Sequence, residues 1–169
     1  MKKTLLTLTI MLFTLTACQQ NQEKELRENV NNTNILVQQM DIFQENVKIV
    51  FTEPTYAFED IQSSSKLMNE NIDKYLLTYK DAEVSEEMKP LKEELINTSN
   101  LMKTIIEDFL GILIDAKNED AFTEEEEQTF INKFVELENN VDLFMIHTQS
   151  LSKHQKEFAE SFNISSVKF

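Results

Sequence analysis

The sequence predicts an all-α protein, an antiparallel up-down-up-down four-helix bundle, and two observations lead to this prediction. The first is the scarcity of turn-forming residues, because the 169-residue chain has only Gly111, Pro54 and Pro90. Folds that contain sheets use glycine and proline at many turns, so their near absence favours few turns and long helices. The second is the spacing of apolar residues, which alternates between three and four positions along four long segments. Short connections between long helices make neighbours antiparallel, and we favour a closed bundle over a more open pair of helical hairpins.

The last segment has the clearest helical pattern. Its predicted buried stripe consists of Phe130, Phe134, Leu137, Val141, Phe144, Thr148, Leu151, Gln155, Phe158 and Phe162. Four further apolar residues are expected to widen this stripe so that the helix faces two neighbours: Ile131, Val135, Met145 and Ile146. The near-heptad spacing, as in a coiled coil, predicts helix crossing angles of roughly 20°.

Three earlier segments carry similar stripes. They run over residues 26–51, 58–82 and 88–116. The first of these stripes comprises Leu26, Val30, Thr33, Val37, Met40, Gln44, Val47 and Phe51, flanked by Leu36, Phe43 and Val50.

Caps and helix breakers predict where the segments begin and end. Thr52-Glu53-Pro54 separates the first helix from the second, because proline fits the first turn of a helix. Ser85 is the expected N-cap of the third helix, although Pro90 moves the expected start towards Lys89. Asn118-Glu119-Asp120 interrupts the pattern, and Thr123 with Glu126 forms a capping box that opens the fourth helix.

The first eighteen residues have the pattern of an export signal. Lys2 and Lys3 precede an apolar stretch over residues 5–15, which is too short for a stable membrane span. The following Leu15-Thr16-Ala17-Cys18 resembles the lipobox of bacterial lipoproteins. The resemblance implies that the Cys18 thiol is joined to diacylglycerol and that a dedicated peptidase cuts before Cys18. Two or three acyl chains such as palmitate, at about 0.8 kcal/mol per buried methylene, make a stable membrane anchor.

These patterns predict the organisation of the chain. Residues 1–17 are the lipoprotein signal peptide, 18–24 are the lipidated cysteine and a polar tether without regular structure, and 25–169 are a single helical domain. The domain is expected at the extracytoplasmic face of the cell membrane, close to the bilayer. Richness in Asn, Lys, Ile and Glu indicates a Gram-positive bacterium. Cys18 is the only cysteine, so no disulfide can form.

The charge of the chain limits its partners. The formal net charge is −14, and removal of residues 1–17 takes away Lys2 and Lys3 but no acidic residue, which gives −16. Such a surface repels nucleic acid, anionic lipid headgroups and anionic wall polymers. We therefore expect no nucleic-acid partner.

No catalytic residue, cofactor or metal site is predicted. His147 and His154 lie seven residues apart on one predicted helix, about 10 Å along its axis, which is too far for one metal ion. Glu124 to Glu127 complement the helix macrodipole, and neither histidine follows a glutamate at the spacing of a di-iron motif. The sequence has no nucleophile elbow, and Cys18 is taken by lipid.

Two aromatic groups allow more than one interpretation. Tyr56, Tyr75 and Tyr79 with Phe58 are expected in the core, although they could line a ligand groove. The apolar residues of the tail, residues 162–169, either fold back over the end of the bundle, which we favour, or dock on a partner.

The leading hypothesis is a non-enzymatic, membrane-anchored helical lipoprotein that binds a protein partner at the outer face of the cytoplasmic membrane. The alternatives are a small-molecule or cation-binding lipoprotein and a phage-exclusion or immunity lipoprotein. In overall pattern the chain is similar to small helical lipoproteins of Gram-positive bacteria that are thought to bind the cell wall, but its acidity argues against direct binding to anionic wall polymers.

Overall fold

The computed structural model describes the backbone of residues 2–52, 58–118 and 123–169, and the side chains from Gln19 onward except those of Phe51 and residues 116–118. The helices are α1 (Lys2–Thr52), α2 (Phe58–Lys80), the short 3₁₀ helix η1 (Glu86–Met88), α3 (Lys89–Asn118) and α4 (Glu124–Ser161). The described residues contain no strand. The predicted all-α fold is confirmed.

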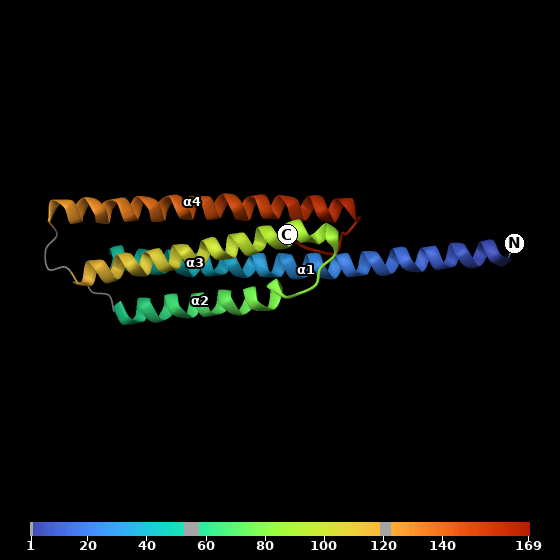
Figure 1. The fold of residues 1–169 in the computed structure, drawn as a ribbon, viewed down its shortest axis with the longest axis horizontal. Helices are drawn as coiled ribbons and strands as arrows, with labels where there is room; N and C mark the ends of the chain where they lie inside the picture. Colours follow the sequence, from blue (N-terminus) through green and yellow to red (C-terminus); the bar gives the residue numbers. More distant parts are fainter. Residues whose placement is uncertain (1, 53–57, 119–122) are drawn as a thin grey trace.

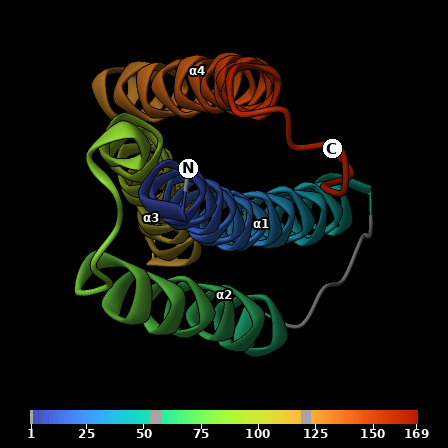
Figure 2. The ribbon, with the colours of Figure 1, turned by 90° about the vertical axis from the view of Figure 1, so that its right-hand side faces the viewer.

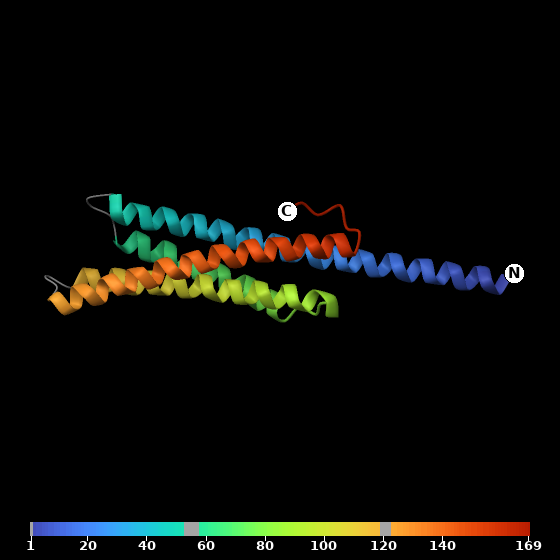
Figure 3. The same cartoon turned by 90° about the horizontal axis from the view of Figure 1, so that it is seen from above.

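The four long helices run alternately in opposite directions, which confirms the up-down-up-down bundle (Figure 1). Seen from the end, α1 and α3 form a central pair, with α4 on one side and α2 on the other (Figure 2). Among the described residues, α2 and α4 make no contact with each other, whereas α1 and α3 contact all the other long helices. From above, α1 diverges from α4 towards the C-terminal end of α1 (Figure 3).

The core contains apolar side chains from all four helices. Phe43, Phe109 and Phe144 are fully buried, as are Met68 on α2 and Met102 on α3. The rings of Phe43 and Phe109 meet edge to face at a centroid distance of 5.2 Å. Full burial of one such side chain stabilises a fold by roughly 1.5–3 kcal/mol, so these residues hold the four long helices together.

The buried face of α1 differs from the predicted one. Leu36 and Phe43 are buried, whereas Val37 is 41% exposed and Gln44 is exposed. The prediction assumed that α1 keeps the same neighbours along its length. Because α1 diverges from α4, its buried face turns towards α2 and α3, and Val37 is left facing a groove beside α4.

The helix ends are partly as predicted. Thr123 forms the capping box with Glu126, and α3 begins at Lys89 with Pro90 in its first turn. Ser85 precedes η1 but its side chain makes no cap. Its hydroxyl instead donates to Glu25 at 2.6 Å, so a contact to α1 replaces the predicted cap. Pro54 and the residues after Asn118 in the predicted break lie outside the described residues.

The N-terminal helix is longer than predicted. Residues 19–24, expected as an irregular tether, continue α1 as helix, and Gln22 is buried. The part of α1 before the bundle extends beyond the other helices (Figure 1). No helix in the described ranges is both long and apolar enough to cross a membrane.

The C-terminal tail folds back over the bundle. Asn163 takes the left-handed conformation with a φ of 53°, which asparagine tolerates better than most residues. The backbone N–H groups of Asn163 and Ile164 donate to the carbonyls of Glu160 and Ala159, which forms a Schellman-type helix end. Ile164 and Val167 are buried in the core. Of the two fates predicted for the tail, the favoured one is therefore found.

Candidate functional site

The residues that follow Cys18 are joined directly to the tail. The Gln19 side-chain amide donates to the carbonyls of Phe162 and Asn163, both at 3.3 Å. Glu23 accepts from the Ser166 hydroxyl at 2.5 Å and from Arg27 at 3.0 Å. The Ser166 hydroxyl, and then Arg27, lower the pKa of Glu23. Hydrogen bonds between α1 and the tail therefore start one residue after the predicted lipidation site, and the first buried side chain of α1 among the described residues is that of Gln22.

Glu25 ties the same end of α1 to the connection between α2 and α3. Its carboxylate accepts from the Ser85 backbone N–H at 3.2 Å, from the Ser85 hydroxyl, and from Asn21 at 2.7 Å. Lys92 on α3 closes the connection from the other side by donating to the carbonyls of Lys80 and Ala82. This end of the bundle, which we call the anchor end, is thus cross-linked by hydrogen bonds on two sides.

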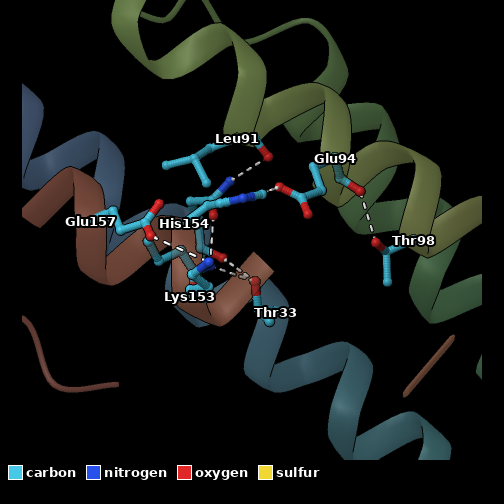
Figure 4. A network of polar contacts seen from close by, with 9 residues as sticks. Thr33, Leu91, Glu94, Thr98, Lys153, His154 and Glu157 are labelled. Carbon is cyan, nitrogen blue, oxygen red and sulfur yellow. Dashed lines mark hydrogen bonds and ion pairs between the residues drawn. The ribbon is translucent and has the colours of Figure 1, made fainter. Parts of the chain in front are cut away.

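A buried polar layer lies just inside the anchor end and joins all four long helices; its bonds among α1, α3 and α4 are drawn in Figure 4. Asn29 on α1 donates to the Tyr79 hydroxyl on α2 at 2.8 Å and to the Leu91 carbonyl on α3 at 3.2 Å. Gln155 on α4 donates to the Asn29 side-chain carbonyl at 2.7 Å and to the Thr33 hydroxyl at 2.8 Å. The Thr33 hydroxyl donates in turn to the Asn29 backbone carbonyl.

The layer leaves no hydrogen-bonding group of the Asn29 amide unused. Both N–H groups and the side-chain oxygen of Asn29 have partners, although its side chain is completely buried. A buried amide without partners would cost about 1–3 kcal/mol for each missing bond. These bonds join α1 to each of the other three long helices, so a shift of any of these helices along its axis would break at least one of them. We infer that the layer fixes the register of the helices, as buried polar residues do in coiled coils.

The tyrosines and Phe58 do not form a ligand groove among the described residues. Tyr79 is buried in the polar layer, and burial raises the pKa of its phenol to about 12. Tyr75 is half-buried and borders a small cavity of about 10 Å³ between α1, α2 and α3. Phe58 packs at the edge of the core, and Tyr56 lies outside the described residues.

An open groove of about 660 Å³ lies between α1 and α4, where the two helices diverge. Its α1 wall includes Val30 and Val37, and its α4 wall includes Gln149 and Lys156. Phe169, the last residue of the tail, also lines the groove. Thr33 and Gln155 reach it from the polar layer, where they already bond to each other.

The two histidines lie apart and have different surroundings. His154 points across the α3–α4 interface, with its Nδ1 atom 2.8 Å from the Glu94 carboxylate (Figure 4). His147 is half-buried one heptad earlier. Among the described residues, no group of three or more His, Cys, Asp or Glu side chains is placed to hold a metal ion. In the predicted acidic run, Glu126 belongs to the capping box, and hydrogen bonds from Thr123 lower the pKa of the Glu126 carboxyl.

The outer face of α4 corrects the prediction of a wide buried stripe. Ile131, Val135, Met145 and Ile146, expected to face a second neighbour, are 47%, 50%, 43% and 60% exposed. The second face stays uncovered because α1 diverges from α4 and α2 lies on the far side of the central pair. The apolar spacing singled out these residues but predicted them in the core.

Two exposed carboxylates lie between these apolar residues. Glu138 and Asp142 continue the spacing of Ile131 and Val135 in alternating steps of three and four. At 3.6 residues per turn, all six residues fall within about a third of the helix circumference. We call Ile131, Val135, Glu138, Asp142, Met145 and Ile146 the outer stripe of α4.

Comparison with protein-family models, with curated proteins and with solved structures gave no significant match.

Proposed function

We propose that this chain is the precursor of a bacterial lipoprotein, held by lipid on Cys18 at the outer face of the cytoplasmic membrane, and that it acts by binding a protein partner rather than by catalysis. The observation that carries the anchor is the lipobox-like Leu15-Thr16-Ala17-Cys18. The hydrogen bonds of the very next residue, Gln19, to the tail support it, because the mature N-terminus is then held in one place on the bundle.

Partner binding is supported by the outer stripe of α4. Apolar side chains scattered singly over a surface are ordinary, but four of them with helical spacing on one uncovered face are typical of a contact surface. A helix of 38 residues spans about 57 Å at 1.5 Å per residue. With the anchor end at the membrane, α4 would present this surface along its length to proteins outside the bilayer.

The groove between α1 and α4 favours one second candidate, a small-molecule-binding lipoprotein. Its volume lies within the range of ligand pockets. However, the groove is open, and the polar groups of Thr33 and Gln155 already form hydrogen bonds with each other and with Asn29. The uncovered stripe therefore supports the partner-binding role more strongly.

Metabolic labelling with a clickable fatty acid tests the anchor. The full chain expressed in a Gram-positive host should be labelled and should fractionate with membranes, whereas Cys18→Ala should be unlabelled. Ala17→Val, which leaves the thiol intact but makes the cleavage motif bulkier, is the matched control: it should keep the label and slow processing. Equal labelling of the wild type and Cys18→Ala would rule out a lipid on this cysteine.

In-cell crosslinking tests the partner. A photoreactive residue at position 135, on the outer stripe, should form a discrete adduct with another protein, and the same residue at the exposed position 67 on α2 should not. Adducts of equal yield at both positions would contradict a specific contact surface on α4.

A further inference from the structure

We propose that the outer stripe of α4 binds a basic amphipathic helix of another protein, in a two-helix contact with two basic side chains at its centre. This inference rests on the proposed partner-binding function and specifies the chemistry of the partner.

The length and pattern of the stripe define the shape of the partner. From Ile131 to Ile146 the stripe is about 22 Å long, or roughly four helical turns. Its steps of four and three residues, 131, 135, 138, 142 and 145, are those of a coiled-coil seam, which receives the side chains of a second helix. Apolar pairs lie at both ends, with Glu138 and Asp142 between them.

The charge of the stripe defines the chemistry of the partner. Glu138 and Asp142 are exposed, and within the described part of the chain neither has an ion-pair partner. Between residues 124 and 142, α4 holds seven acidic residues and one lysine, whereas between 143 and 161 it holds two acidic residues and two lysines. The field around the stripe is therefore negative, which attracts a cationic helix and speeds its association.

The same charge argues against two other occupants. A second copy would bring Glu138 and Asp142 against their own counterparts, and like charges in an interface cost affinity. An anionic lipid surface would be repelled for the same reason. A partner helix with leucine-type residues at its ends and two lysines or arginines one turn apart at its centre would satisfy both the apolar and the charged parts of the stripe.

The test uses the full lipidated chain in nanodiscs of zwitterionic phosphatidylcholine and two fluorescent helical peptides. The basic peptide has about four turns, with leucines on one face in its first and last turns and two lysines between them on that face. The acidic peptide replaces those two lysines with glutamates. Peptide anisotropy is measured against the wild type, Glu138→Lys/Asp142→Lys, Ile131→Ser/Val135→Ser, and the control Leu67→Ser/Leu77→Ser on the exposed face of α2.

The wild type should bind the basic peptide at least tenfold more tightly than the acidic one, and the charge-reversed variant should invert this preference. Ile131→Ser/Val135→Ser should weaken binding about tenfold or more, while the α2 control should change it less than twofold. Because every substituted side chain is exposed, circular dichroism should show wild-type helicity in all variants and melting temperatures no lower than that of the wild type.

Several outcomes would overturn the proposal: no saturable binding, equal binding by the charge-reversed variant, or loss of binding in the α2 control. Sedimentation that shows a dimer broken by Ile131→Ser/Val135→Ser would assign the stripe to a second copy instead. If fatty-acid labelling succeeds but the basic peptide does not bind, only the proposal about the outer stripe is rejected. If labelling fails, the same titration is done with the unlipidated chain in solution, and peptide binding there would reject the anchor alone.

Discussion

Asn29 is the residue on which the anchor end most depends. Within the described part of the chain, it is the one side chain that bonds directly to partners on each of the other three long helices. Asparagine is a poor helix former, and an apolar residue at this position would pack without needing partners. We explain its buried position in α1 by its three hydrogen bonds, which fix the register of the helices. An apolar residue in its place would give a more stable core but would not fix this register.

Tyr79 makes the stability of this layer depend on pH in the alkaline range. Burial raises the pKa of the Tyr79 phenol to about 12, whereas in the unfolded chain it ionises near 10. The unfolded state therefore loses this proton first as the pH rises, and the free energy of unfolding falls between about pH 10 and pH 12, by roughly 2–3 kcal/mol.

Urea unfolding at pH 9 and pH 11.5 measures this dependence. Tyr79→Phe removes the phenol, so its free energy of unfolding should fall less between pH 9 and pH 11.5 than that of the wild type. At pH 9 the variant should already be less stable, because Asn29 loses the Tyr79 hydroxyl as a hydrogen-bond acceptor. Lysines titrate in both proteins, so the difference between the two reports Tyr79. An equal loss in both would contradict a raised phenol pKa.

Among the structural elements, the tail joins both the core and the surface of α1. Within residues 162–169, Ile164 and Val167 enter the core and Ser166 bonds to Glu23. The tail thus covers the end of the bundle next to the predicted anchor, where a helix end without cover would expose apolar side chains. The tail thus connects the end of α4 to the first turns of α1 that lie within the bundle.

Truncation tests this role of the tail. A chain that ends at Asn163 loses the burial of Ile164 and Val167 and should be less stable by about 3 kcal/mol. The matched control ends at Lys168 and removes only the half-exposed Phe169, so its free energy of unfolding should change by less than about 0.5 kcal/mol. Chemical denaturation compares the full chain with the two truncated chains. Similar unfolding midpoints for both truncated chains would mean that Ile164 and Val167 do not contribute to stability.

At the scale of the whole molecule, charge opposes compactness. The net charge after the predicted cleavage is −16, and −6 of it, from seven acidic residues and one lysine, lies in the half of α4 that is furthest from the anchor end. Most of the ion pairs that offset it are exposed, such as Arg27–Glu23 and Lys48–Glu45, and exposed pairs contribute only about 0–1 kcal/mol each. Self-repulsion should therefore outweigh these attractions.

Salt should consequently stabilise the protein. Raising sodium chloride from 20 mM to 500 mM shortens the screening length and weakens the repulsion more than it weakens the few exposed pairs. We expect Tm to rise by several degrees, measured by circular dichroism. Lys substitution of Glu124 and Glu125, which lie outside the capping bond of Glu126, should reduce this salt effect. A Tm that falls with salt would show that attraction dominates.

The sequence alone determined the fold class and most of the helix ends. Scarce glycine and proline, the three–four spacing and the Thr123 capping box are local properties, and each acts within a few residues of the chain. The lipobox-like motif is local in the same sense, since four consecutive residues define it, and its lipid remains a prediction that labelling tests. The apolar residues of the tail predicted two outcomes, either folding back over the end of the bundle or docking on a partner. The sequence of the tail alone could not decide between these two outcomes.

Tertiary structure decided which apolar faces are covered. Ile131, Val135, Met145 and Ile146 have the same residue types and spacing as core positions, so no local signal separates them from Phe134 or Leu137. Their exposure depends on the path of α1 away from α4, and the burial of Leu36 instead of Val37 has the same cause. The bonds of Asn29 to Tyr79 and Gln155 likewise join residues 50 and 126 positions apart. Helical periodicity reports the side of a helix that is apolar, whereas only the packing of whole helices decides whether another helix lies against it.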